Sequence, residues 1–466
     1  MSESAIAVPV AALPEREATA FGHPRGLVFL AFTEVWERFS FYGMQALLVL
    51  YLVDTLLRPD HIGRVAGLVA LRTGVERVLG PLSTQAFASE IFGLYGGLVY
   101  FTPVFGGLVG DRLLGQRRTV MLGAALMSIG HLLMAFDRSF LIALGFLIVG
   151  CGCLKGNISA QVGKLYQPGD PRRTRAFAVF NVAINVGGLF GPFVCGAIGE
   201  VYGWRYGFAV AGVLMVLGLI TYAAGQRWMP PDSLRRPHDP HPPHPRLNGG
   251  DWRLIAALFL MLFIGLFFSI AYYQLSDVYM LWVRATVNRR LFGLTVPVTW
   301  FGGIDSFFTI ASTPLLIGLW RWQAGRRREP SDLVKIGIAS AAVAVAYLML
   351  AALSLGPGQV NMLWPLLFSA VLGTAFVYQW PTTLTLVSRI APAAVNSTMM
   401  GVAFLTLFVS YTVVGWVGGF YERLTPAGFW LLHAGIGGFG AVLVMIFNPL
   451  LSRVFALAPD PGHKTP

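Results

Sequence analysis

The sequence predicts an all-α integral membrane protein with twelve transmembrane helices in two bundles of six. Of its 466 residues, 55% are hydrophobic and only 12% are charged, whereas soluble domains carry about 25% charged residues. A chain of this composition cannot bury all its apolar side chains in one core, so much of its surface must face lipid. Soluble enzymes and soluble binding modules are therefore poor interpretations, and we expect no enzymatic activity.

Long apolar stretches are the second observation that predicts this fold. A helix needs about 18 or more such residues to cross the hydrocarbon core, and the alternating ten-residue segments of lipid-embedded barrels are absent. The least apolar stretch is 119–136. The predicted spans are 26–55, 88–111, 119–136, 139–163, 176–198, 206–226, 254–283, 297–320, 333–354, 361–387, 397–421 and 428–452.

A polar segment at 227–252 separates the first six spans from the last six. Its many prolines rule out a helix and predict an extended linker. Its histidines offer loose metal ligands, but a plain linker is the favoured interpretation. Two similar halves around a midplane site are typical of transporters. The predicted organisation is a tail at 1–25, a bundle at 26–226, the linker at 227–252, a second bundle at 253–455 and a tail at 456–466.

The net charge of +12 is explained by topology rather than by nucleic-acid binding. If both termini are cytoplasmic, most lysines and arginines fall in cytoplasmic tails and loops, as the positive-inside rule requires. We therefore expect a multi-pass protein of the bacterial inner membrane, monomeric, with lipid as its surroundings. No cofactor or metal is expected, because the three cysteines lie within spans and lack acidic or histidine partners.

The predicted outer loop at 56–87 contains its own helical pattern. From Ile62 to Leu79, apolar residues recur at helical spacing with charged residues between them. This pattern predicts a short amphipathic helix at the membrane face. Capping of the structure is a better interpretation of this helix than substrate binding.

The inner loop after the second span, at 106–118, is rich in glycine and arginine and contains Asp111 and Arg112. It resembles the signature loop of the major facilitator superfamily, which implies the fold of that superfamily. Small residues permit close helix contact. Asp111 is expected to pair with a neighbouring arginine or to lie at a helix N-terminus, and so to hold one conformation closed. The alternative is a merely solvated basic turn.

Three ionisable residues crowd the first predicted span: Glu34, Glu37 and Arg38. Their spacing of i, i+3 and i+4 places all three on one side of one helix. Charges in hydrocarbon are costly, so the trio must line a cavity or a seam between helices. Uptake of one proton makes the trio neutral, which provides a way to couple a proton to conformation. A purely structural ion-pair cluster is the alternative.

Lys155 is the one lysine deep within a predicted span. A buried ammonium needs a carboxylate from another helix, and we expect that partner to be Glu34, Glu37 or a carboxylate of the substrate. Together with Arg38 it places two cationic donors in one half of the protein.

Three segments in the first half carry a specific resemblance. Residues 34–39 (Glu-Val-Trp-Glu-Arg-Phe), 154–159 (Leu-Lys-Gly-Asn-Ile-Ser) and 180–189 resemble signatures of the proton-dependent oligopeptide transporter family, with Gly156 where that family usually has proline. The likeness is almost unbroken from 24 to 226 and looser beyond.

This resemblance implies roles for individual residues. Glu34, Glu37 and Arg38 would couple the proton, and Arg38 with Lys155 would hold the substrate carboxylate by a forked donor and a point charge. The remaining residues implied to bind a small peptide are Tyr42, Tyr95, Asn185, Tyr273, Gln274 and Trp380.

The second half departs from the family pattern. Tyr273-Gln274 stands where the family has Glu-Gln, and no acid occurs from Leu333 to Tyr421. Aromatic rings are offered instead, and rings bind cations by their π faces at about 0.5–2 kcal/mol. The rings concerned are those of Tyr272, Tyr273, Tyr378 and Trp380.

Asp277 and Asp305 are the acids that remain to replace the missing glutamates. If they do not replace them, we expect both to have gating or structural roles. The alternative for Asp277 is a rim residue paired with Arg284. The alternative for Asp305 is a hydrogen bond between helices.

Three functions follow in order of preference. The first is a proton-coupled symporter of di- and tripeptides or similar amphoteric molecules. The second is a carrier of a non-peptide organic anion, because two cations without opposing glutamates favour an anion. The third is a transport-inactive, ligand-binding membrane protein.

Overall fold

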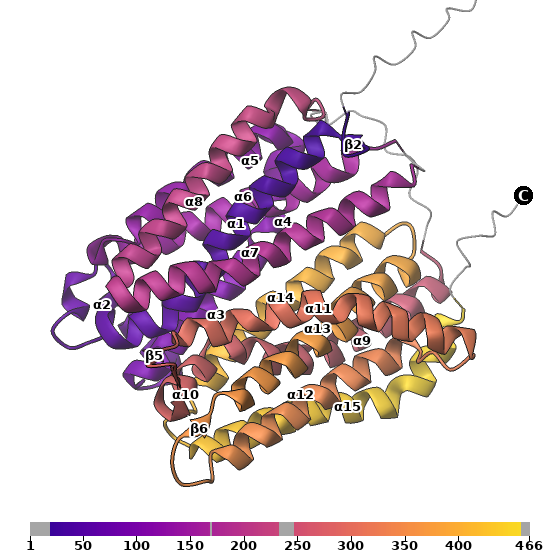
Figure 1. Cartoon of the computed structure of the whole chain (residues 1–466). Helices are drawn as coiled ribbons and strands as arrows, with labels where there is room; N and C mark the ends of the chain where they lie inside the picture. Colours follow the sequence, from indigo (N-terminus) through magenta and orange to yellow (C-terminus); the bar gives the residue numbers. More distant parts are fainter. Residues whose placement is uncertain (1–18, 168–169, 233–246, 458–466) are drawn as a thin grey trace, which may run out of the picture.

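The computed structural model describes residues 19–167, 170–232 and 247–457, which form two helical bundles lying side by side (Figure 1). Residues 1–18, 233–246 and 458–466 lie outside the described residues, and they include most of the predicted linker and parts of both predicted tails. The second bundle begins at Gly249, inside the range predicted as linker, because Asn248 and Asp251 form a capping box there.

The first bundle contains α1 to α8. Its first helix, α1, runs on into a π-helical turn at Leu52–Leu56, and α4 likewise continues into a π-helical turn at Gly110–Leu114. The helices are α1 (Arg25–Tyr51), α2 (Leu68–Leu79), α3 (Thr84–Phe101), α4 (Pro103–Val109), α5 (Gln116–Leu133), α6 (Phe140–Lys164), α7 (Arg172–Tyr202) and α8 (Trp204–Gly225).

The second bundle contains α9 to α15. Its first span is interrupted by a short 3₁₀ turn at Gln274–Ser276, which separates α9 from α10. The helices are α9 (Gly249–Tyr273), α10 (Val278–Thr286), α11 (Val298–Gly325), α12 (Asp332–Leu353), α13 (Leu363–Ile390), α14 (Asn396–Gly418) and α15 (Pro426–Phe455).

Eleven of the helical segments in the described chain are long and apolar enough to cross a membrane. The twelfth predicted span, 119–136, corresponds to α5, which has 18 residues but begins with Gln116, Arg117 and Arg118. This polar start lowers its mean hydropathy. It nevertheless packs between α6 and α8 as a member of the first bundle.

Short strands are the exception to the all-α prediction. The six strands of the described residues are two residues long each and pair as β1 (Thr19–Ala20) with β2 (His23–Pro24), β3 (Val287–Asn288) with β6 (Val360–Asn361), and β4 (Arg290–Leu291) with β5 (Leu294–Thr295). They tie loops together at the ends of the helices.

The amphipathic helix predicted over 62–79 is confirmed in its second part. Ile62–Arg64 forms a separate 3₁₀ turn, and α2 begins at Leu68 after Gly67, whose φ of 79° ends the preceding turn. The left-handed backbone at Gly67 is a conformation that glycine adopts without strain.

Glycines bring α1 and α7 into close contact. A Cβ atom at Gly187 would lie 2.6 Å from the Arg38 Cβ atom and 2.7 Å from the Val35 carbonyl oxygen. Only a residue without a side chain permits this approach. The close packing fixes the part of α1 that carries the charged trio.

The two ends of the molecule differ in how the bundles meet. We call the end with β2, Gly225 and Phe455 the basal end, and the end with α2 and β6 the distal end; β2 and α2 lie at opposite ends in Figure 1. Direct packing of α3 on α14 and of α7 on α11 joins the bundles. Within the described chain, their polar contacts lie on the distal side of Arg38.

Polar contacts between the bundles close the distal end, and three of them are the following. Arg284 pairs with Asp54 across the bundles. The Glu200 carboxylate accepts hydrogen bonds from the backbone N–H groups of Val298 and Thr299, each at 2.9 Å. The Gln85 amide donates to the Gly418 carbonyl at 3.1 Å.

Candidate functional site

A cavity of about 630 Å³ lies between the two bundles. Residues of α1, α6 and α7 line one face, and residues of α9, α11, α13 and α14 line the other. It extends toward the basal end, past Phe177 and Leu384. Its polar and aromatic lining includes Glu34, Arg38, Tyr42, Gln45, Tyr100, Lys155, Asn181, Asn185, Tyr272, Tyr273, Asp305, Ser306, Trp380 and Tyr411.

The predicted charged trio is assembled on α1 and is almost completely buried. Arg38 donates from two nitrogens to the two carboxylate oxygens of Glu37, and its Nε atom lies 3.4 Å from Glu34. Glu37 is 0% exposed, and the second oxygen of Glu34 has no hydrogen-bond partner in the described chain. The fork of Arg38 is thus held by Glu37, while Glu34 faces the cavity with one free acceptor.

Lys155 lines the same face from α6, and of its expected partners neither Glu34 nor Glu37 pairs with it in the described chain. No acid in the described part of the chain lies within ion-pair distance of it. Its Nζ atom instead lies 3.8 Å from the centroid of the Tyr100 ring. A cation on an aromatic face is held more weakly than one on a carboxylate, so Lys155 is a donor available to an anionic group in the cavity.

The opposite face of the cavity is aromatic and carries one acid, Asp305. Its carboxylate accepts a hydrogen bond from the Tyr272 hydroxyl at 2.6 Å, and the Ser306 hydroxyl lies 3.5 Å away. The Tyr273 ring lies 4.4 Å from the Tyr411 ring, centroid to centroid. The hydrogen bond between helices predicted for Asp305 is present, and the carboxylate also lines the cavity.

Four of the predicted site residues lie behind the cavity wall, namely Glu37, Tyr95, Gln274 and Asp277. Glu37 supports Arg38, and Tyr95 is 3% exposed and stacks on Phe41. Gln274 donates to Asp277 at 3.0 Å. Of these, only Glu37 acts directly on a residue that lines the cavity.

Asp277 is fully buried between the bundles, so the predicted alternative of a rim pair with Arg284 is wrong. It accepts hydrogen bonds from Ser89 at 2.8 Å and from Gln274 at 3.0 Å, while Arg284 pairs with Asp54. The 3₁₀ turn after α9 rotates Asp277 away from the cavity and toward α3. It therefore belongs to the distal contact between the bundles.

Asp111 and Arg112 lie in an exposed π-helical turn at the basal end. Asp111 accepts a hydrogen bond from the Gln116 amide at 3.2 Å, and no ion pair to an arginine forms in the described chain. Of the two predicted arrangements, the arginine pair is not formed, and Asp111 instead contacts the first residue of α5.

The rings of the second bundle divide between cavity and interior. Tyr272, Tyr273 and Trp380 line the cavity, whereas Tyr378 packs edge-on against Trp320. Residues missed from the sequence are Gln45, Tyr100, Asn181, Ser306 and Tyr411. Only the polar character of Gln45 and Asn181 within apolar spans could have indicated them.

Two helical bundles around a polar cavity, sealed at one end by contacts between the bundles, define a transporter of the alternating-access class. The chain matches the model of the POT family over residues 117–236 and 250–431. It therefore belongs to the POT family and is a multi-pass membrane transporter, which confirms the predicted resemblance.

Two named relatives match nearly the whole chain. It is 30% identical to the "Di-/tripeptide transporter" of Lactococcus lactis subsp. cremoris, covering 94% of this chain and 98% of that one. It is 26% identical to the "Peptide transporter YePEPT" of Yersinia enterocolitica, covering 93% and 95%.

Solved structures share the fold. The chain is similar to a crystal structure of a peptide transporter POT in complex with sulfate, with a TM-score of 0.82 and 23% identity over 94% of this chain and 97% of that one. A POT family transporter in complex with 5-aminolevulinic acid gives a TM-score of 0.80 at 23% identity, over 94% and 98%. This likeness confirms the major facilitator architecture.

Proposed function

We propose that this protein is a proton-coupled symporter of di- and tripeptides or similar small amphoteric molecules. The observation that carries the proposal is the opposition of charges across the cavity: Arg38 and Lys155 on one face, Asp305 with its neighbouring rings on the other. A small peptide presents a carboxylate at one end and an ammonium at the other, which suits this arrangement. The named di- and tripeptide transporters among its relatives support the same substrate class.

Proton coupling is assigned to the trio on α1. When Glu34 is ionised it competes with a substrate carboxylate for the charge of Arg38, and when it is protonated that competition ends. Glu37 keeps Arg38 in place throughout because both of its oxygens are bonded. Proton and substrate carboxylate then affect each other's binding reciprocally.

The substrate is held at both ends. Lys155 supplies a point charge to the carboxylate, and Tyr42 and Asn185 lie on the same face. The ammonium meets Asp305 and the rings of Tyr273 and Trp380. Tyr95 and Gln274 act only as support from behind.

For orientation we assign the basal end to the cytoplasm of a bacterial inner membrane, with both termini inside. The positive-inside rule supports this assignment. The conformation described here, closed at the distal end, is then the inward-facing state. A monomer suffices because the cavity is formed within one chain.

A second function, transport of an organic anion, is favoured by one observation. Lys155 has no carboxylate partner in the described chain, so the first-bundle face attracts anions more strongly than the second-bundle face attracts cations.

Uptake into reconstituted vesicles tests the proposal. An inward proton gradient should drive accumulation of labelled dialanine, and unlabelled dialanine should compete. Peptide exchange that ignores the gradient would disprove coupling. Uptake of an organic anion without uptake or binding of any peptide would favour the second function.

A further inference from the structure

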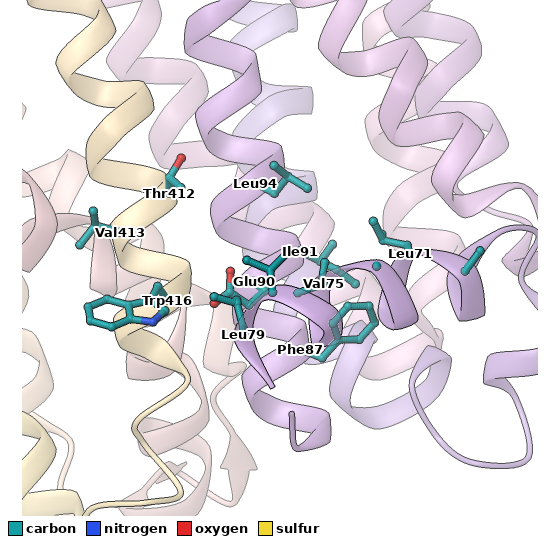
Figure 2. Close-up of a pocket in the computed structure, with 13 residues that line it drawn as sticks. Leu71, Val75, Leu79, Phe87, Glu90, Ile91, Leu94, Thr412, Val413 and Trp416 are labelled. Atoms are coloured by element: carbon teal, nitrogen blue, oxygen red, sulfur yellow. The ribbon is translucent and has the colours of Figure 1, made fainter. Parts of the chain in front are cut away.

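A second large hollow lies outside the transport cavity, at the distal end between α2, α3 and α14 (Figure 2). It has a volume of about 670 Å³, comparable with the central cavity. We call it the α2 crevice. It is lined by Ala70, Leu71, Gly74, Val75, Val78, Leu79, Phe87, Glu90, Ile91, Leu94, Thr412, Val413 and Trp416.

The crevice opens onto the apolar outer surface rather than into the centre of the protein. Several of its lining residues are large hydrophobics with exposed side chains: Val78 is 83% exposed, Trp416 50% and Leu94 42%. In a membrane-spanning protein this surface faces lipid. A hydrocarbon chain is therefore the component of the surroundings that fits the crevice.

Glu90 is the one charged residue in the lining. The residue is half-buried, and within the described residues its carboxylate has no hydrogen bond and no ion pair. Of the two arginines on α2, Arg72 pairs with Glu76 at 2.9 Å, and within the described residues neither Arg72 nor Arg77 lies within ion-pair distance of Glu90. A carboxylate among apolar side chains without a cation is costly, so an ammonium from outside the chain would be stabilised there.

Depth in the membrane separates the polar part of the crevice from the apolar part. Glu90 lies near the distal start of α3, and Trp416 near the distal end of α14. Tryptophan is typical of the headgroup level. Leu94 and Thr412 lie one turn deeper on the same helices, above Glu90 and Trp416 in Figure 2.

From this arrangement we propose that the α2 crevice binds a phospholipid with a primary-ammonium headgroup, namely phosphatidylethanolamine. The ammonium pairs with the Glu90 carboxylate, and an acyl chain extends past Ile91 and Leu94. The crevice has walls from both bundles, α2 and α3 from the first and α14 from the second. The bound lipid therefore favours the arrangement with a closed distal end, because ligands stabilise the state that they bind.

Two substitutions separate the headgroup contact from the chain contact. Glu90→Gln removes the charge and keeps the shape, and Glu422→Gln, an exposed acid in the loop after α14, is its control. Gly74→Leu fills the crevice, since a Cβ atom at Gly74 meets nothing within 4 Å. Gly63→Leu is its control, because Gly63 is equally open but lies outside the crevice lining.

Native mass spectrometry of the detergent-solubilised protein measures the binding. With equimolar dioleoyl phosphatidylethanolamine and dioleoyl phosphatidylglycerol, the unmodified chain and both controls should bind the former preferentially. Glu90→Gln should lower phosphatidylethanolamine binding about fivefold, and Gly74→Leu should lower binding of both lipids. The thermal unfolding of each variant is recorded beside it.

Three outcomes would overturn the proposal. They are an unchanged preference in Glu90→Gln, unchanged lipid binding in a folded Gly74→Leu, and preferential binding of phosphatidylglycerol. A dimer mass that Gly74→Leu abolishes would assign the crevice to a second copy of this chain instead. None of these results bears on uptake of peptides, so the proposed transport function is tested separately.

Discussion

The two faces of the central cavity are built from different chemistry. The first-bundle face carries a guanidinium, an ammonium and a carboxylate, with Glu37 behind them. The second-bundle face carries rings and the single acid Asp305, whose carboxylate is already engaged by Tyr272. One face is built to bind a charge strongly, and the other is built to accept varied shapes.

This difference indicates a division of labour. Forked and charge-assisted hydrogen bonds are directional and strong, so under the proposed function we expect the first-bundle face to position the substrate carboxylate. Contacts between a cation and aromatic rings are weaker and less directional. We therefore expect the second-bundle face to tolerate many substrate side chains and to contribute less binding energy. The predictions below test that asymmetry.

The largest effect is expected from Glu37→Gln. This change leaves the buried Arg38 with only Glu34 as a charged partner. The trio is then neutral when Glu34 is ionised, so it no longer carries the net negative charge that uptake of a proton cancels. We expect gradient-driven accumulation of dialanine to be lost while peptide exchange across the membrane persists. Glu422→Gln, which alters an exposed acid, should behave like the unmodified protein.

Exchange serves as the measure of folding in that experiment. Removing one partner of a buried ion pair can cost about 3–5 kcal/mol, so loss of both activities would report only unfolding. Accumulation by Glu37→Gln at the unmodified level would show that the coupling proton does not use this trio.

A smaller but specific effect is expected from Lys155→Ala. Because Lys155 rests on the Tyr100 ring without a carboxylate partner in the described chain, it is free to bind the substrate carboxylate. Affinity for dialanine should fall about tenfold, or about 1.4 kcal/mol, and affinity for its C-terminal amide should fall much less. Lys164→Ala, at the exposed end of the same helix, is the matched control.

Equal losses for the peptide and its amide would contradict the role given to Lys155. They would indicate that the ammonium organises the cavity rather than binding the carboxylate. Competition assays with both ligands on the same vesicles give the comparison.

The charged residues of the first-bundle face could be predicted from the sequence, whereas the choice of rings that line the second-bundle face could not. Glu34, Glu37 and Arg38 share one helix, so their spacing alone places them together, and the cost of charge in lipid points them inward. Tyr378 and Trp380 are two residues apart on α13, which is more than half a helical turn. Which of the two lines the cavity depends on how α13 is rotated against α11, and the apolar pattern of a span leaves that rotation open.

Contacts between distant segments account for the other differences between the predicted and the observed site. Asp277 was predicted either to replace a missing glutamate or to pair with Arg284 at the rim, but the 3₁₀ turn at Gln274–Ser276 directs it into the seam beside Ser89. Tyr411 carried no signal, because one tyrosine in an apolar helix is unremarkable until Gly96 lets it approach α3. The order of the spans follows from local composition, whereas the seam between bundles does not.

Asp305→Asn tests the weaker face. The amide retains an oxygen for the Tyr272 hydroxyl and keeps the helices together, but it no longer attracts an ammonium. We expect affinity for dialanine to fall about threefold to fivefold, with no change for N-acetylated dialanine. A loss as large as that of Lys155→Ala would remove the asymmetry between the faces, and an equal loss for the acetylated peptide would assign Asp305 to structure alone.

The smallest effect is expected at the distal seam, from Arg284→Gln. The pair of Arg284 and Asp54 joins the bundles, but both side chains are about one-third exposed, at 33% and 31%. Exposed pairs of this kind contribute at most about 1 kcal/mol, so the ratio of distal-open to distal-closed protein should rise less than about fivefold. Spin labels on α3 and α14 measure that ratio, with Arg423→Gln in the same region as control. A larger shift would mean that charge at the seam, rather than glycine-mediated packing of α3 on α14, holds the distal end closed. Charged contacts would then dominate at the distal end, as they do on the first-bundle face of the cavity.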